Sequence, residues 1–316
     1  MYYEPDERWG LFGITDRELF QANFVVKGHF HAGVPEEVRE AYRTVEYLLA
    51  SAWHYWPLYD EGFNKAMRLI EMAVKLKAKA LGIVLSKDDK NGNSRSVALV
   101  HLIDKICPDP HHVLIKQRLN HFRKLRNWQM HPDSHSFMGG VGGLVKKIKS
   151  VVNLLNLMFL ADAELVEMHN RMETFQSSLL PFQDRLLVLE GPENKYLIHA
   201  IHTFIAVRDT YFISLEPVVL NAWEEMSNHR YLQPLIVVIK GLTIDRDCIS
   251  GQAPEGSRVT LSVNKKDENI QTHKTFCEDL AKLDKTSRGF YQSHLTNGCH
   301  WQIEERLYDW WGPSIQ

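Results

Sequence analysis

The sequence has few cysteines, no long apolar run and almost no net charge, and each shortage argues against a class of protein. Its four cysteines stand far apart without a CxxC pair, which argues against a zinc ribbon or a disulfide framework and fits a reducing cytoplasm. The most apolar segment, 151–166, contains two asparagines and an aspartate and is too short to span a bilayer. The first ten residues carry acids instead of a basic stretch before an apolar run, so no signal peptide is expected. We therefore expect a cytoplasmic protein without a membrane partner.

Charge is unevenly distributed along the chain, although the net charge of −2 implies no general affinity for nucleic acid. Between His111 and Ser150, eight lysines and arginines accompany a single acid, Asp133, and five of the sixteen histidines fall in the same segment. A local excess of this size predicts a surface for an anionic partner. A solvated helix face would carry the same pattern, so charge alone leaves both interpretations open.

The first half of the chain shows apolar residues at helical spacing. Helices are predicted near residues 36–52, 61–82, 97–106, 110–131 and 144–175. Pro35 suits the first turn of the first of these helices. Pro132 should end the fourth, because the residue before a proline avoids the helical region. The polar segment 86–96 is expected to be a surface loop.

The second half changes to short β-rich runs after Pro181. Strands are predicted at 195–207, 211–215, 235–244 and 258–263, and helices at 217–229, 269–285 and 304–311. The first two strands, separated by Arg208-Asp209-Thr210, predict a hairpin. The expected fold class is therefore α + β. It comprises an N-terminal arm at 1–33, an all-α helical bundle at 34–178 and a smaller α+β domain at 179–316 with a regulatory or partner-binding role.

Two pairs of histidines are close enough in the sequence to be considered as metal ligands. His29 and His31 alternate as in a strand, but a lone His-x-His without further ligands nearby is more often structural. His199 and His202 lie three residues apart in a predicted strand, hence on opposite faces, which argues against a shared metal. The sequence predicts neither a metal site nor a cofactor.

The segment Arg126-Asn127-Trp128-Gln129-Met130-His131-Pro132 combines a fixed positive charge, a titratable base and a forced backbone break. Histidine transfers protons near neutral pH because its ordinary pKa is about 6.5. The planar fork of arginine binds phosphate through parallel hydrogen bonds. These groups can cleave RNA without a metal when the 2′-hydroxyl attacks the neighbouring phosphorus. In the structural alternative, Arg126 pairs with a surface acid and His131 caps the helix C-terminus.

The spacing of the motif constrains its geometry. Five residues along a continuous helix would point Arg126 and His131 about 140° apart. They can share one pocket only if the helix ends between them, as Pro132 suggests, or if a two-fold dimer builds a common cleft. A dimer would also bring together two copies of His131, one acting as base and the other as acid.

The pattern Arg126-Asn127-x-x-x-His131, at the end of one helix and before another long helix, resembles the R-x4–6-H signature of the HEPN superfamily. The resemblance covers roughly residues 34–178. It implies a helical bundle that dimerises and acts as a metal-independent endoribonuclease in toxin–antitoxin, abortive-infection or other prokaryotic antiviral defence systems. Arg126 and His131 would then be catalytic, with Asn127 in support.

Neighbouring residues extend this hypothesis to an RNA surface. The expected contacts to the RNA backbone are Arg123, Lys124, Lys146, Lys147 and Lys149. Trp128 could stack on a base, although a tryptophan in an amphipathic helix is more often part of a core or a dimer interface. The expected partners are RNA, a second copy of the chain, and an antitoxin or trigger protein. The alternatives are a non-catalytic HEPN-type module that binds RNA or protein, and an interaction protein whose motif is accidental.

Overall fold

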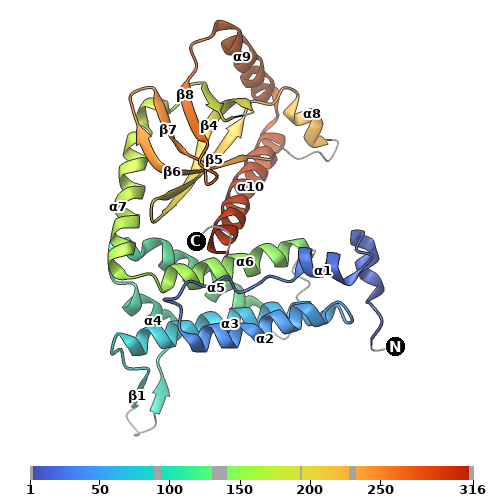
Figure 1. Cartoon of the computed structure of the whole chain (residues 1–316), viewed down its shortest axis with the longest axis vertical. Helices are drawn as coiled ribbons and strands as arrows, with labels where there is room; N and C mark the ends of the chain where they lie inside the picture. Colours follow the sequence, from blue (N-terminus) through green and yellow to red (C-terminus); the bar gives the residue numbers. More distant parts are fainter. Residues whose placement is uncertain (1–2, 89–93, 130–140, 193, 228–232, 313–316) are drawn as a thin grey trace. The chain divides into compact units, whose positions relative to one another are not determined.

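The structure is a computed structural model of the chain, and it describes residues 3–88, 94–129, 141–192, 194–227 and 233–312. Backbone contacts divide the chain into two compact units. The helical unit contains the residues up to Leu165 together with the end of the last helix from Tyr308, and the barrel unit contains Val166–Leu307 (Figure 1). The division falls inside a helix, α7 (Asp162–Ser178). None of the helices in the described part of the chain combines the length and apolar character that a membrane span needs.

The helical unit is organised around its longest helix, α3 (Pro57–Ala80). Four further helices pack against it: α2 (Glu36–Ser51), α4 (Leu99–Ile106), α5 (Val113–Gln129) and α6 (Val141–Met158). Each has an apolar face, and in α2 the buried residues Val38, Tyr42, Val45 and Leu49 recur every three or four positions. The predicted helices of this half are confirmed apart from their limits and one break.

Helix α3 starts at Pro57, so the predicted start after Asp60 was placed too far along the chain. A proline suits the first helical position because its missing N–H has no partner within the helix there. The predicted helix at 110–131 begins instead as a short 3-10 turn, η2 (Pro110–His112), which leads into α5. The end of that prediction at Pro132 lies outside the described residues.

The prediction of one helix over 144–175 was wrong, because α6 and α7 are separate helices. The chain breaks after Met158, and α7 starts with the backbone N–H of Ala161 donating to Glu164 Oε2 over 3.0 Å. This contact is half of a capping box, which stabilises a new helix start.

The predicted loop at 86–96 contains a small hairpin. Strand β1 (Ser86–Asp88) pairs antiparallel with β2 (Ser94–Ser96), with Ser86 opposite Ser96. The prediction of a loop was therefore wrong for the residues of β1 and β2. Two polar segments can pair through their backbone hydrogen bonds even when neither has an apolar face.

The N-terminal arm packs on the helical unit through an aromatic cluster. Trp9, in the 3-10 turn η1 (Glu7–Phe12), is 1% exposed, and its indole N–H donates to the Ala52 carbonyl over 2.9 Å. Its ring lies 4.5 Å from that of Phe20 in helix α1 (Arg17–Phe24) and 4.4 Å from that of Trp56. The arm is therefore part of the folded unit.

Asp6 fastens this arm to the start of α3. Its carboxylate accepts hydrogen bonds from the Arg8 guanidinium, at 2.6 and 2.8 Å, and from the Trp56 N–H at 2.9 Å. The Arg8 side chain is the main cause that lowers the pKa of Asp6 to about 2. We predict that Asp6→Ala lowers the free energy of unfolding by about 1–2 kcal/mol near neutral pH.

The pH dependence of this effect has a defined sign. A carboxylate whose pKa is lowered by folding stabilises the protein above its ordinary pKa of 3.8 and loses that contribution as the pH falls to about 2. The difference between wild type and Asp6→Ala should therefore shrink between these two values. Hydrogen exchange of peptides covering residues 7–24 and 48–60 measures it, with the exposed Glu7→Ala as a control of equal charge change. An equal effect of both substitutions would contradict the prediction.

The barrel unit contains a closed antiparallel β-barrel whose strands follow one another in chain order (Figure 1). The strands are β3 (Leu187–Glu190), β4 (Lys195–Val207), β5 (Thr210–Pro217), β6 (Leu235–Ile244), β7 (Cys248–Gln252) and β8 (Arg258–Val263). Pairing of β3 with β8, with Leu187 opposite Val263, closes the ring. An even number of antiparallel strands can close in this way without leaving an edge.

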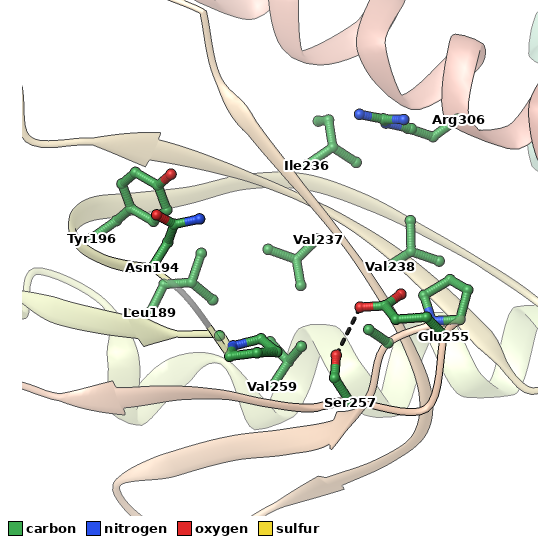
Figure 2. Close-up of a pocket in the computed structure, with 14 residues that line it drawn as sticks. Leu189, Asn194, Tyr196, Ile236, Val237, Val238, Glu255, Ser257, Val259 and Arg306 are labelled. Atoms are coloured by element: carbon green, nitrogen blue, oxygen red, sulfur yellow. Dashed lines mark hydrogen bonds between the residues drawn. The ribbon is translucent and has the colours of Figure 1, made fainter.

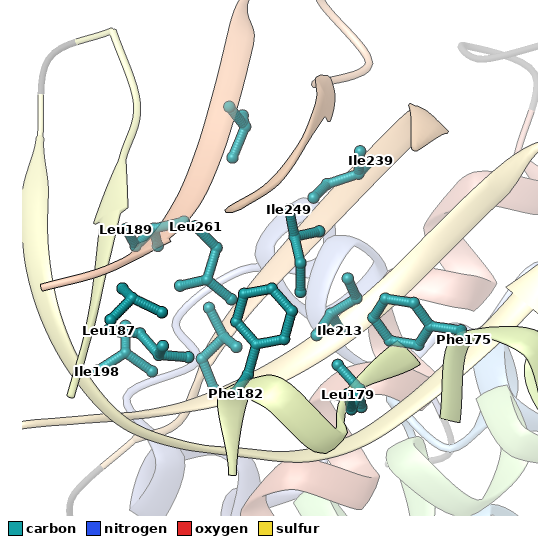
Figure 3. Packing of buried hydrophobic residues seen from close by; sticks show 13 residues of the cluster. Phe175, Leu179, Phe182, Leu187, Leu189, Ile198, Ile213, Ile239, Ile249 and Leu261 are labelled. Carbon is teal, nitrogen blue, oxygen red and sulfur yellow. The ribbon is translucent and has the colours of Figure 1, made fainter. Parts of the chain in front are cut away.

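The barrel core combines inward-facing strand residues with side chains from the segment that leads into the barrel. Leu187, Ile213 and Ile249 are at most 1% exposed. Phe175 at the end of α7 and Phe182 in the 3-10 turn η3 (Leu180–Phe182) join the same apolar cluster (Figure 3). The barrel therefore depends on residues that precede its first strand.

The expected fold class, an all-α bundle followed by a smaller α+β domain, is corrected by this barrel. The hairpin of β4 and β5 is confirmed, and β6 and β8 have the predicted limits. Strands β3 and β7 were missed. Helix α8 (Ala222–Ser227) begins later than the predicted start at Pro217, and the short helix expected at 304–311 is the end of α10 (Lys285–Trp311). Each missed strand has at most five residues, so it carries little sequence pattern of its own.

Candidate functional site

Arg126 lies in the last turn of α5, where a cation is favoured by the helix dipole. Its Nη1 donates to Glu71 Oε2 of α3, and its Nη2 donates to Asn127 Oδ1 over 3.2 Å. The Arg126 side chain remains 28% exposed and that of Glu71 31% exposed. Two of the three predicted catalytic residues therefore form one contact group with an acid that the sequence analysis did not identify.

Glu71 is shared between two cations. Its Oε1 accepts from Lys75 Nζ over 2.8 Å, one helical turn further along α3. This hydrogen bond is the main cause that lowers the pKa of Glu71, and Arg126 adds to the lowering against the effect of burial. Glu71 is therefore ionised at neutral pH, fixes the guanidinium and offsets part of its charge. Arginine has five N–H groups, so this pairing leaves others to bind a phosphate.

His131, the third predicted catalytic residue, lies outside the described residues. Trp128 belongs to α5, but its side chain is likewise outside the described part of the chain. The expected convergence of Arg126 and His131 therefore stays a prediction.

The predicted RNA-contacting lysines and arginines differ in exposure. Lys124 on α5 and Lys146 on α6 are exposed, and these two helices pack against each other. Arg123 Nε donates to Asn120 Oδ1 over 3.2 Å. Lys147 is half-buried, and desolvation lowers its pKa. Lys149 places its ammonium 5.2 Å from the centre of the Tyr308 ring, a cation–π contact within the helical unit.

A histidine cluster lies at the opposite end of α5. His111 Nε2 is 3.0 Å and His112 Nε2 is 3.4 Å from Asp162 Oδ1. Burial and the neighbouring His111 lower the pKa of His112. A helix of this length spans about 25 Å, so the cluster is separate from Arg126.

His31 has a structural role, as the sequence analysis favoured for the His29/His31 pair. Its Nδ1 accepts from the Gly33 N–H at 3.0 Å, so its Nε2 carries the proton and donates to the Asn156 carbonyl at 2.9 Å. Both ring nitrogens are used, and neither has a free lone pair for a metal.

One cavity of the barrel unit has a volume of about 610 Å³ (Figure 2). Its apolar wall includes Leu189, Val259 and three successive residues of β6, Ile236 to Val238. Polar groups come from Asn194, Tyr196, Glu255 and Arg306. An apolar wall with a few polar groups is typical of a small-molecule site.

A second cavity, of about 460 Å³, brings together histidines that the sequence analysis had separated. His199 and His202 both line it, and the expectation that they lie on opposite faces was wrong. The reason is local: the register of β4 against β5 shifts between Ile198 and Ala200 and again between Ile201 and Thr203. Each histidine therefore occupies a bulge, where the strict alternation of a strand is lost.

Two further residues of this cavity, His273 and Cys277, come from helix α9 (Asp267–Lys282) and were missed by the sequence analysis. Their spacing of four residues, which places both on one helix face, is the signal that could have identified them.

Comparison of the chain with models of known protein families, with curated proteins and with solved structures gave no match.

Proposed function

We propose that the protein is a metal-independent endoribonuclease of HEPN type, in which Arg126 and His131 cleave RNA. The observation that carries the proposal is the anchoring of Arg126 by Glu71 in the last turn of α5, five residues before His131. A guanidinium held in one orientation before substrate arrives needs no reorganisation when charge develops on the phosphate.

The chemistry follows from these residue types. The 2′-oxygen of RNA attacks the adjacent phosphorus, the bond from phosphorus to the 5′-oxygen breaks, and a cyclic phosphate and a 5′-hydroxyl result. His131 removes the 2′-proton, and its copy in a partner subunit protonates the leaving oxygen. Arg126 compensates the negative charge on the phosphorane, and Asn127 supports the arrangement.

The RNA path and the biological role belong to the same proposal. The exposed Lys124 and Lys146 lie on the two helices that flank the His131 segment, where they can follow a phosphate backbone. The proposed setting is prokaryotic antiviral defence or a toxin–antitoxin system. The barrel unit would regulate cleavage or bind a trigger or antitoxin.

A non-catalytic RNA- or protein-binding module is the second candidate. In this candidate the pairing of Arg126 with Glu71 is purely structural. This candidate predicts that removal of Arg126 or His131 leaves binding and cell toxicity unchanged.

We predict that His131→Ala reduces RNA cleavage in the presence of a chelator by at least about 100-fold, the lower range for loss of a general acid or base. Arg126→Ala should cause a similar loss, whereas Glu71→Gln, which keeps an acceptor for the guanidinium, should retain most activity. The assay follows cleavage of a labelled RNA by the purified chain and identifies a cyclic phosphate product. The control is His101→Ala, which removes an exposed histidine of α4.

Three results would contradict the nuclease proposal. They are undiminished cleavage by His131→Ala, a strict requirement of the wild type for a divalent metal, and loss of activity in His101→Ala equal to that in His131→Ala. RNA binding without cleavage by the wild type, unchanged in both motif variants, would support the second candidate.

A further inference from the structure

Three side chains with metal-binding atoms converge in the barrel unit. His199 Nδ1 lies 2.9 Å from His273 Nε2, and Cys277 Sγ lies 3.5 Å from the same His273 nitrogen. All three ligand atoms lie within 4.8 Å of one another. The cluster is distinct from Arg126, which belongs to the other unit.

The fold brings these residues together through two local features. The bulge in β4 turns His199 toward the cavity, against the ordinary alternation of the strand. Helix α9 packs against β4, with the fully buried Phe276 contacting the His199 ring at 5.2 Å between centroids. Phe276 therefore anchors the helix while His273 and Cys277, one turn apart, face the same cavity.

Two of the three separations between the ligand atoms are close to those of a tetrahedral zinc site. Bond lengths of about 2.0–2.1 Å to nitrogen and 2.3 Å to sulfur place two nitrogens about 3.3 Å apart and a nitrogen and a sulfur about 3.6 Å apart. The 3.5 Å distance from His273 Nε2 to Cys277 Sγ agrees with this geometry. The two imidazoles would separate by about 0.4 Å on metal binding, a movement within reach of side-chain rotation.

The donor set and its surroundings identify the class of metal. Two imidazole nitrogens and one thiolate suit a borderline-soft ion such as Zn²⁺ better than Mg²⁺ or Ca²⁺, which prefer oxygen ligands. The three residues line a cavity of about 460 Å³ that also contains Gln183 and Asp184. A fourth ligand from solvent therefore has room to bind.

We infer that the barrel unit holds a Zn²⁺ ion on His199 Nδ1, His273 Nε2 and Cys277 Sγ, with a fourth coordination position open to the cavity. Three protein ligands and one exchangeable position are the arrangement of zinc sites that bind or activate small molecules. Binding converts the Cys277 thiol to a thiolate, and the proton passes to solvent. The inference does not depend on RNA cleavage by the helical unit.

The test uses the full-length chain, stripped with a chelator and titrated with Zn²⁺ or Co²⁺ alone. The wild type should bind one equivalent, and the Co²⁺ form should show thiolate-to-metal charge-transfer absorption. Cys277→Ser should lose this absorption. Cys277→Ser and His273→Ala should each weaken Zn²⁺ binding by more than about 100-fold. Loss of a residue that only supports a metal ligand already weakens binding by about 10- to 100-fold, and loss of a ligand itself should cost more.

A control variant separates ligation from general damage to the cavity. His202→Gln changes a histidine that lines the same cavity but bonds to Glu216 rather than to the cluster, and it should retain the metal. Far-ultraviolet circular dichroism checks that each variant is folded. Absence of a stoichiometric site or of thiolate absorption in the wild type would overturn the inference without reference to any variant. Equal metal loss in folded His202→Gln and His273→Ala would overturn the assignment of the ligands.

Discussion

Replacing Phe175 by alanine should lower the free energy of unfolding of the barrel unit by about 3–5 kcal/mol, the usual cost of removing a buried phenylalanine. Phe175 is 1% exposed although it belongs to helix α7. Its ring lies 4.6 Å from that of Phe204 in a T-shaped arrangement and 5.4 Å from that of Tyr211. Truncation leaves a void among strand side chains whose positions are set by backbone pairing, so the site can collapse only partly.

Hydrogen exchange of peptides from β4 and β5 measures this effect, because it reports opening of the barrel unit separately from the helical unit. The matched control is Phe290→Ala on α10, where the ring is 50% exposed and the cost should stay below about 1 kcal/mol. Equal effects of the two substitutions would show that α7 is not part of the barrel core.

Replacing Glu216 by alanine should destabilise the same unit by about 3 kcal/mol, because two hydrogen bonds to a buried charge are lost together. Glu216, at 3% exposure, accepts from His202 Nε2 and from the Tyr291 hydroxyl, each over 2.7 Å. Burial alone raises the pKa of Glu216, but the bonds from His202 and Tyr291 outweigh it, so the pKa lies below its ordinary value of 4.5. The group is ionised at neutral pH, and His202 Nε2 must carry the proton that it donates.

The sign of the pH dependence follows from the lowered pKa. The stability that comes from ionised Glu216 is complete above its ordinary pKa of 4.5 and is lost as the pH falls through the lower folded value. The difference between wild type and Glu216→Ala should therefore shrink at acid pH. Calorimetry measures this difference in stability on the unfolding transition of the barrel unit, the same transition that Phe175→Ala should affect.

Two further variants define the contribution of the network. Tyr291→Phe removes one hydrogen bond and should cost about 1–1.5 kcal/mol. Glu278→Ala removes an acid that is 56% exposed, 3.9 Å from Lys274, and should change stability by less than about 0.5 kcal/mol. A Glu216→Ala effect as small as that of Glu278→Ala would contradict the proposed role of the network.

Local sequence pattern was sufficient wherever an element buries its own apolar face. Helix α2 and strand β8 were predicted because their apolar residues recur with the period of the element, and β6 because it is a nearly continuous run of apolar, β-branched residues. Strand β7 was missed because Gly251 weakens its pattern. A glycine in a sequence suggests a turn, but here the close approach of β7 to β6 requires it. A Cβ atom at position 251 would lie 2.3 Å from Ile239 Cγ2 and 2.7 Å from the Lys240 carbonyl oxygen.

The candidate site also combines features that the local sequence predicts with features that depend on the fold. The types and spacing of Arg126, Asn127 and His131 led directly to the hypothesis of RNA cleavage. The pairing of Arg126 with Glu71 could not be predicted, because the two residues are 55 positions apart and meet only when α5 packs on α3. The cluster of His199, His273 and Cys277 could not be predicted either, since it depends on a bulge that alters the direction of a side chain.

The sequence by itself determined which segments are helices or long strands and placed Arg126 and Asn127 near the end of a helix, because these properties depend on residues three to five positions apart. Only the tertiary structure decided that six strands close into a barrel, that Phe175 completes its core, and that Glu71 holds Arg126. These contacts join residues distant in the chain, and their free energy depends on packing that no local pattern encodes. The Arg126 motif therefore gives the chemical hypothesis, and the folded chain supplies the partners by which it can be tested.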